Sequence, residues 1–113
     1  MKGDRELIKK ILEYIEDIEE DVVNCQDIET FLEKKIYFRS CITSLTQIGE
    51  LVKRLSPEIT NGYSEVEWSK IARLRDYLVH GYVKVEPIEI WNDVTEDVPK
   101  LKEKLIKILS EIN

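Results

Sequence analysis

The chain contains few of the residues that build metal centres or disulfide scaffolds. Its 113 residues include two cysteines, three prolines, four glycines and a single histidine. Cys25 and Cys41 do not form a C-x-x-C pair, and one histidine is too few to complete a zinc site with them. We therefore expect both thiols to be reduced and packed, and we expect the protein to need no metal or other cofactor.

Long apolar runs and common enzyme motifs are also absent. No run approaches the roughly 20 residues that span a bilayer, and the first residues, MKGDRELIKK, become charged too early for a secretory signal. There is no glycine-rich phosphate loop, no G-x-S-x-G and no H-E-x-x-H. We expect a cytoplasmic protein with no membrane contact. A chain of this length supports one core, so we expect a single domain over residues 1–113.

The charge is acidic overall but unevenly distributed. The net charge of −6 argues against nucleic acid, because such binding is driven largely by neutralising phosphates. Residues 1–33 carry four basic and eleven acidic groups, and residues 85–113 carry four and seven. Residues 34–84 carry nine and five, which leaves +4 and favours a local basic surface. An ordinary solvated, lysine-rich face explains the same numbers, and both interpretations stay open at this point.

Apolar residues recur every three or four positions along most of the chain, which is the spacing of amphipathic helices. We expect a first helix over residues 4–23 with Asp4 as its N-cap. An unusually long second helix is expected over residues 27–55, before Pro57. The stretch 56–63 contains Pro, Asn and Gly and is expected to be a loop.

The second half of the chain has clearer start and stop signals. Ser64 and Glu67 have the spacing of a capping box ahead of a third helix, which should end at Gly81 in the left-handed conformation. A fourth helix is expected from Glu86–Pro87, and Pro99 either kinks it or precedes a fifth. No alternating strand pattern occurs. The predicted fold is all-α, an antiparallel bundle of four or five helices.

The single histidine lies in the string ARLRDYLVHGY, from Ala72 to Tyr82. Arg75 precedes His80 by five positions, with Asp76 directly after the arginine and Tyr82 two residues after the histidine. This arrangement resembles the Arg-x4-His-x-Tyr signature of the HEPN superfamily, specifically the HepT-like toxins that are paired with MntA-like minimal nucleotidyltransferase antitoxins. The resemblance covers about residues 38–109 and includes the flanking pieces Ile48-Gly49-Glu50, Trp68, Ile71-Ala72, Ile90-Trp91 and Val98-Pro99.

The resemblance implies both an activity and a set of partners. It implies a HEPN-like helical domain that forms a homodimer and acts as the toxin of a type VII-like toxin–antitoxin pair. The implied activity is that of a metal-independent endoribonuclease, with Arg75 and His80 as catalytic residues and Asp76 as a supporting polar residue. Tyr82 is implied as the tyrosine that the nucleotidyltransferase antitoxin AMPylates to switch the enzyme off. The implied partners are a second copy of the chain, that antitoxin and an RNA substrate.

The chemistry of these residues is consistent with that activity. Cleavage of RNA by its own 2′-hydroxyl needs a base, an acid and cations around the phosphate. A histidine titrates near neutral pH, and arginine offers a planar fork of donors that matches phosphate oxygens. On an ideal helix Arg75 and His80 diverge by roughly 140°, so they converge only if the helix bends near Gly81 or a second subunit contributes. A two-fold dimer supplies two histidines.

Simpler roles for the same residues also stay open. His80 can answer the dipole at a helix C-terminus, and Arg75 can form a surface ion pair worth under about 1 kcal/mol. Tyr82 can be a buried packing residue. At the level of function, two alternatives to the ribonuclease remain. One is a non-catalytic helical partner that presents substrate to a minimal nucleotidyltransferase, and the other is a purely structural bundle.

Overall fold

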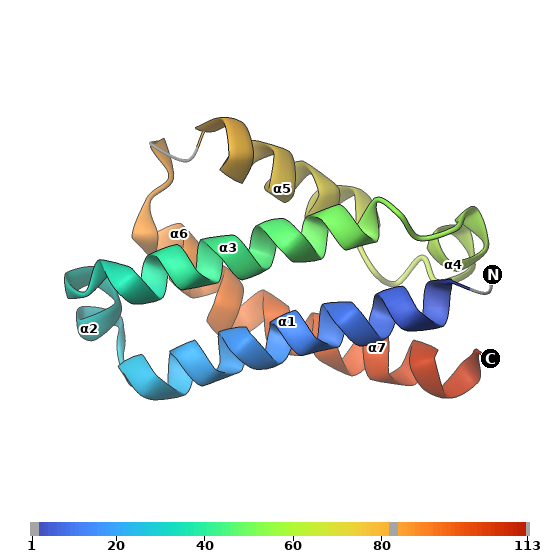
Figure 1. The fold of residues 1–113 in the computed structure, drawn as a ribbon, viewed down its shortest axis with the longest axis horizontal. Helices are drawn as coiled ribbons and strands as arrows, with labels where there is room; N and C mark the ends of the chain where they lie inside the picture. The colour runs from blue at the N-terminus through green and yellow to red at the C-terminus, as the bar shows by residue number, and fades with distance from the viewer. Residues whose placement is uncertain (1–2, 82–83, 113) are drawn as a thin grey trace.

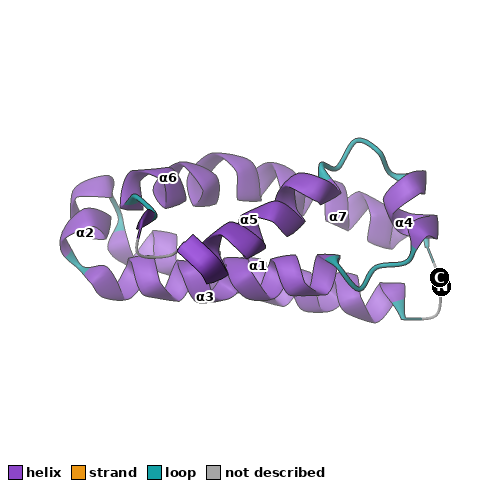
Figure 2. Ribbon diagram, turned by 90° about the horizontal axis from the view of Figure 1, so that it is seen from above, coloured by secondary structure: helices purple, strands orange, loops and turns teal. Residues whose placement is uncertain are grey.

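The computed structural model of the protein describes residues 3–81 and 84–112. Within these ranges the regular elements are all helical (Figure 2), which confirms the predicted all-α fold class. None of the described helices is both long enough and apolar enough to cross a membrane. The elements in chain order are α1 (Asp4–Cys25), α2 (Ile28–Glu33), α3 (Lys35–Val52), α4 (Pro57–Gly62), α5 (Trp68–Gly81), α6 (Pro87–Asn92), the π-helical turn η2 (Asp93–Asp97) and α7 (Val98–Glu111).

The long helices form an antiparallel bundle. Helix α1 packs against α3 on one side and α7 on another, and α5 packs against α3 (Figure 1). The core is built around α1, whose isoleucines at positions 8, 11, 15 and 18 are fully buried. Their three- and four-residue spacing places them on one face of the helix. Burying each such side chain contributes roughly 1.5–3 kcal/mol, which explains why this predicted helix forms.

The helix caps predicted at Asp4 and Ser64 are both wrong. Asp4 is the first residue of α1 rather than its N-cap, and its carboxylate accepts hydrogen bonds from the backbone N and the Oγ of Ser56, at 3.0 and 2.6 Å. Helix α5 begins at Trp68, so Ser64 lies too early in the loop to be its N-cap. The Asp4 carboxylate therefore binds Ser56, 52 positions away in the sequence, instead of a backbone N–H of its own helix.

The predicted long helix over residues 27–55 is two helices. Lys34 is extended, with φ −100° and ψ 96°, and separates α2 from α3. The break lets Phe31 turn inward, where its ring lies 5.2 Å from that of Trp91 and 6.3 Å from that of Phe38. Phe31 is 1% exposed. Packing of α2 against α6 therefore outweighs helix continuity, and no proline or glycine marks the break.

The stretch expected to be a loop contains a short helix, α4, whose Ile59 is buried against the core. The fourth helix begins at Pro87 as predicted. Of the two alternatives at Pro99, neither describes the structure fully, because the π-helical turn η2 joins α6 to α7 without a loop. The Val98 N–H donates to the carbonyl of Asp93, five residues back, immediately before the proline that has no N–H to donate.

Candidate active site

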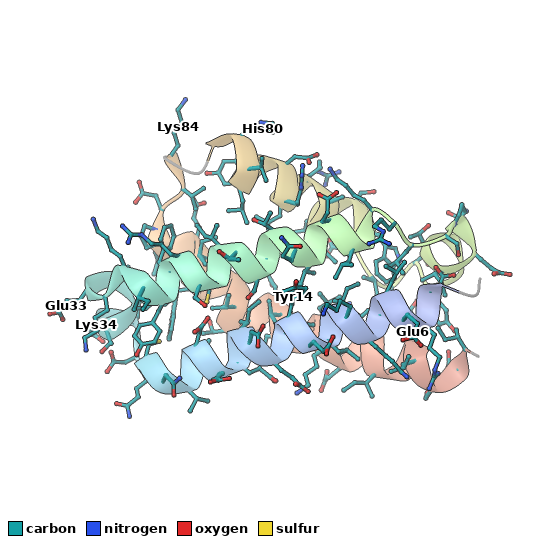
Figure 3. The ribbon with its side chains drawn as sticks, viewed as in Figure 1. Glu6, Tyr14, Glu33, Lys34, His80 and Lys84 are labelled. Atoms are coloured by element: carbon teal, nitrogen blue, oxygen red, sulfur yellow. The ribbon has the colours of Figure 1, made fainter. Side chains whose placement is uncertain are left out.

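Helix α5 carries three of the predicted site residues, and its buried side chains are Trp68 at its start and Leu78 near its end. Trp68 is buried, and its Nε1 donates a hydrogen bond to the carbonyl of Tyr63 at 3.0 Å. Helix α5 packs on α3 but diverges from it toward the C-terminal end (Figure 1). His80, one residue from that end, is exposed and projects away from the bundle (Figure 3).

Arg75 lies in the contact between α5 and α3. Directly opposite is Gly49, where a Cβ atom would lie only 2.2 Å from the Cβ and 2.9 Å from the Cγ of Arg75. No residue with a side chain fits at position 49 unless the two helices move apart. The arginine stem therefore lies flat against α3, and the side chain as a whole is 25% exposed.

The guanidinium of Arg75 joins a network of four charged groups. Its Nε lies 2.7 Å from Oε2 of Glu50 on α3, and its Nη1 donates to Oδ1 of Asp76 at 3.1 Å. Lys53 donates to the same oxygen of Asp76 at 2.5 Å. Nε is buried, yet its N–H is not aligned with the Glu50 carboxylate well enough for a hydrogen bond, so the contact is an ion pair.

The network sets the charge state of Asp76. The hydrogen bond from Lys53, followed by that from Arg75, holds the pKa of Asp76 below its ordinary value. Asp76 is thus an anion at neutral pH that accepts from two cations. Asp76 contacts Arg75 through Nη1, and its role as the residue that supports the arginine stays a prediction.

The structure does not bring Arg75 and His80 together within one chain. Helix α5 remains helical through Gly81, and among the described residues no glycine has a positive φ, so the predicted left-handed end is wrong. Without a bend, the two side chains stay on different faces of α5. His80 makes no hydrogen bond or ion pair with any described residue. Tyr82 lies outside the described residues.

Three neighbours of the site were not predicted from the sequence as functional residues. Gly49 and Glu50 belong to the pieces that flank the motif, and Lys53 is one of the nine basic residues of the segment 34–84. A glycine inside a helix is a signal for close approach of another segment. Glu50 and Lys53 are three residues apart and so share a face of α3, but only the packing of α5 shows what that face contacts.

A second feature lies on the other side of α5. A cavity of about 400 Å³ is bounded by α3, α5 and the η2–α7 segment, with mostly apolar walls. Its charged residues include Lys70 on α5 and the pair Asp93 and Asp97 on η2. Burial, the hydrogen bond with Asp97 and the charge of Asp97 raise the pKa of Asp93 to about 6. In the described part of the chain no cluster of three or more metal-ligating side chains occurs.

An all-α bundle that presents an arginine, a following aspartate and an exposed histidine on one helix defines a class of protein, and comparison with known sequences names it. Residues 11–108 match the family described as "Ribonuclease HepT-like". The chain belongs to this HepT-like family, which confirms the resemblance drawn from the motif. No solved structure gives a significant match.

Relatives with assigned names cover most of the chain. A "Putative RNase" of Caldanaerobacter subterraneus subsp. tengcongensis is 33% identical over 98% of both chains. A "Probable ribonuclease HepT" of Thermococcus cleftensis is 35% identical over 85% of this chain and 93% of its own length. A "Gamma-glutamylcyclotransferase and putative RNase" of Methanocaldococcus jannaschii is 34% identical over 94% of this chain. The chain spans about half of that protein's length, 47%.

Proposed function

We propose that this chain is an endoribonuclease that cleaves RNA without a metal, using Arg75 and His80 from two subunits. The observation that carries the proposal is the placement of an exposed histidine and a clamped arginine on one helix of a HepT-like protein. The names of the relatives support RNA cleavage as the activity. The lack of a metal and the use of two subunits are our inference from the residues.

The reaction assigns a task to each group. His80 removes the proton of the 2′-hydroxyl, which attacks the adjacent phosphorus, and a second histidine protonates the departing 5′-oxygen. Arg75 stabilises the negative charge that builds up on the phosphate oxygens. Asp76 holds Arg75 through Nη1 and Lys53 through its ammonium. The products are a 2′,3′-cyclic phosphate and a free 5′-hydroxyl, so atoms and protons balance without a metal-bound water.

A homodimer supplies the second histidine. One chain has a single histidine, and α5 runs straight past it, so Arg75 and His80 of the same chain remain apart. Tyr77 and Val79, within three residues of His80, are 42% and 45% exposed. Apolar side chains of this size beside the site support a subunit interface there. A two-fold axis near His80 then brings two copies of each residue to one cleft.

The activity is tested on purified protein with mixed-sequence RNA in the presence of EDTA. We expect cleavage to persist and to leave 2′,3′-cyclic ends. His80→Ala and Arg75→Ala should each lower the rate on the order of 10²-fold or more. Lys9→Ala, an exposed cation on α1, is the control and should be unaffected. Full activity of His80→Ala, with unchanged helical content, would contradict the mechanism.

Dimerisation has its own measurement. Sedimentation at assay concentration should give a dimer, and a fully active monomer would contradict the two-subunit site. Mixing His80→Ala with native protein offers a further check. Heterodimers of the two contain a single His80, so an excess of the variant should lower the activity per native chain if the reaction needs both histidines, and an unchanged activity per native chain would contradict the two-subunit site.

We further propose that the chain is the toxin of a toxin–antitoxin pair and that a partner nucleotidyltransferase inactivates it by AMPylating Tyr82. The motif places Tyr82 two residues after His80. An added AMP would bring a negative charge and a base-sized body beside the histidine, opposing the RNA phosphate by repulsion and by blocked access. Expression of the chain alone should stop growth. Mass spectrometry after co-expression with the transferase should find AMP on Tyr82 and none in Tyr82→Phe, whereas an inhibited complex with unmodified Tyr82 would contradict the proposal.

A further inference from the structure

Arg75 is contacted by acidic groups on two of its three guanidinium nitrogens. Glu50 Oε2 lies 2.7 Å from Nε, and Asp76 Oδ1 accepts from Nη1 at 3.1 Å. Nη2 makes no hydrogen bond with any residue in the described ranges. Because the guanidinium is a rigid planar fork, fixing its Nε side also fixes where the remaining N–H groups point.

Glu50 and its neighbour Gly49 act on different parts of the same arginine. The missing side chain of Gly49 lets the Cβ and Cγ of Arg75 lie against α3. The next residue on α3, Glu50, then meets the Nε of the head group. Since α3 is packed against both α1 and α5, the carboxylate that faces Nε is carried by a rigid element of the bundle.

We propose that Glu50 is a positioning residue, which holds the guanidinium of Arg75 by its Nε side so that the Nη2 side is presented to the RNA phosphate. The consequence for cleavage rests on the proposed ribonuclease function, whereas the orientation of Arg75 does not. Glu50 does not touch the substrate in this scheme. Glu50 acts through Arg75. It contacts the guanidinium from α3, whereas Asp76 contacts the guanidinium from α5, the helix that carries the arginine.

The charges argue for orientation over attraction. The network holds two anions, Glu50 and Asp76, against two cations, Arg75 and Lys53, so it is neutral as a whole. An acid beside the phosphate-binding arginine weakens the local positive potential and opposes RNA binding. Removing that charge should therefore leave binding unchanged or make it tighter. If Glu50 orients Arg75, the same change should slow the chemical step, because small misplacement of a catalytic group is costly.

The opposite signs of these two effects separate positioning from a structural ion pair. An exposed ion pair that serves no function contributes little to stability and nothing to the chemical step. Glu50→Gln removes the charge at nearly constant shape, and Glu50→Asp keeps the charge on a shorter side chain. Glu13→Gln is the matched control, because Glu13 forms an exposed ion pair with Lys10 on α1, at 3.5 Å.

The first measurement does not depend on activity. In a nitrogen–proton correlation spectrum, the Nε–H of Arg75, assigned through Arg75→Lys, should be resolved and protected from exchange with water in the native protein. We expect the signal to shift and to exchange faster in Glu50→Gln, to be largely kept in Glu50→Asp and to be unchanged in Glu13→Gln. An unchanged Nε–H signal in Glu50→Gln would overturn the proposal, whether or not the protein cleaves RNA.

The second measurement is cleavage of mixed-sequence RNA under single-turnover and steady-state conditions. Glu50→Gln should lower kcat on the order of 10-fold or more while KM stays equal or falls, and Glu50→Asp should recover part of kcat. If the native protein cleaves RNA and Glu50→Gln has the same kcat, the positioning role of Glu50 is overturned but the proposed function stands. Native protein that does not cleave RNA refutes the proposed function, and the Nε–H signal then decides the orientation of Arg75 alone.

Discussion

Gly49 offers a direct test of how closely α3 and α5 must pack. In Gly49→Ala the new Cβ would lie 2.2 Å from the Cβ of Arg75 and 3.3 Å from the carbonyl oxygen of Ile71. Ordinary carbon contacts are about 3.5–4.0 Å, and neither partner can rotate away, because one is bonded to the backbone and the other belongs to it. The two helices must therefore separate by on the order of 1 Å.

The cost of that separation sets the expected result. Overpacking of this kind costs about 1–3 kcal/mol, and the gain of alanine over glycine within a helix offsets about 0.5–1 kcal/mol of it. A net loss of about 1–2 kcal/mol corresponds to a fall in Tm of about 4–8 °C for each kcal/mol in a domain of about 100 residues. The separation should also move Arg75 away from Glu50, which adds loss of RNA cleavage to loss of stability.

Thermal unfolding followed by circular dichroism measures the change, with Gly62→Ala as the control. No atom lies within 4 Å of a Cβ built at Gly62, the last residue of α4, so that variant should keep the native Tm or raise it slightly. A Gly49→Ala protein with the native Tm and an unchanged Arg75 Nε–H signal would refute the argument that this glycine is required for the contact.

Three further outcomes follow from buried or paired groups. Because its pKa is raised to about 6, Asp93 resists ionisation beside Asp97. Asp93→Asn should therefore stabilise the protein on the order of 1–2 kcal/mol at about pH 8 and much less at about pH 4. Equal gains at both pH values in denaturant titrations would contradict this. Burial and the nearby Asp21 raise the pKa of Cys41 to about 12, so its thiol should react with an alkylating reagent only as fast as the protein unfolds. Rapid labelling of the native protein would contradict burial of this thiol. For Asp4, burial raises the pKa, but the hydrogen bonds from Ser56 together with other interactions lower it below the ordinary carboxyl value. The stabilisation from these interactions is present above the ordinary pKa and is lost as the pH falls through the folded value, so Asp4→Asn should lower Tm at neutral pH more than in acid, and a pH-independent effect would be contrary evidence.

The features that depend on neighbours in the chain were predictable from the sequence. The amphipathic period predicted α1 over nearly its full length, and Pro87 marked the start of α6 correctly because proline suits the first helical turn. The string around His80 identified the family, because its information lies in residue types at fixed spacing. Arg75, Asp76 and His80 were named as candidate residues on the same grounds.

The features that depend on distant contacts were decided by the tertiary structure. Local preferences are worth about 1 kcal/mol or less, and burial of one large side chain exceeds that. Burying Phe31 was therefore enough to break the predicted helix at Lys34. In the same way, the Asp4 carboxylate binds Ser56 instead of capping its own helix. The same reason applies to the candidate site. Glu50 and Lys53 reach the motif from another helix, and which residues of α3 meet Arg75 depends on the register of α3 against α5. The missing side chain of Gly49 lets the two helices approach closely at that point, and no local pattern in the sequence specifies what lies opposite it.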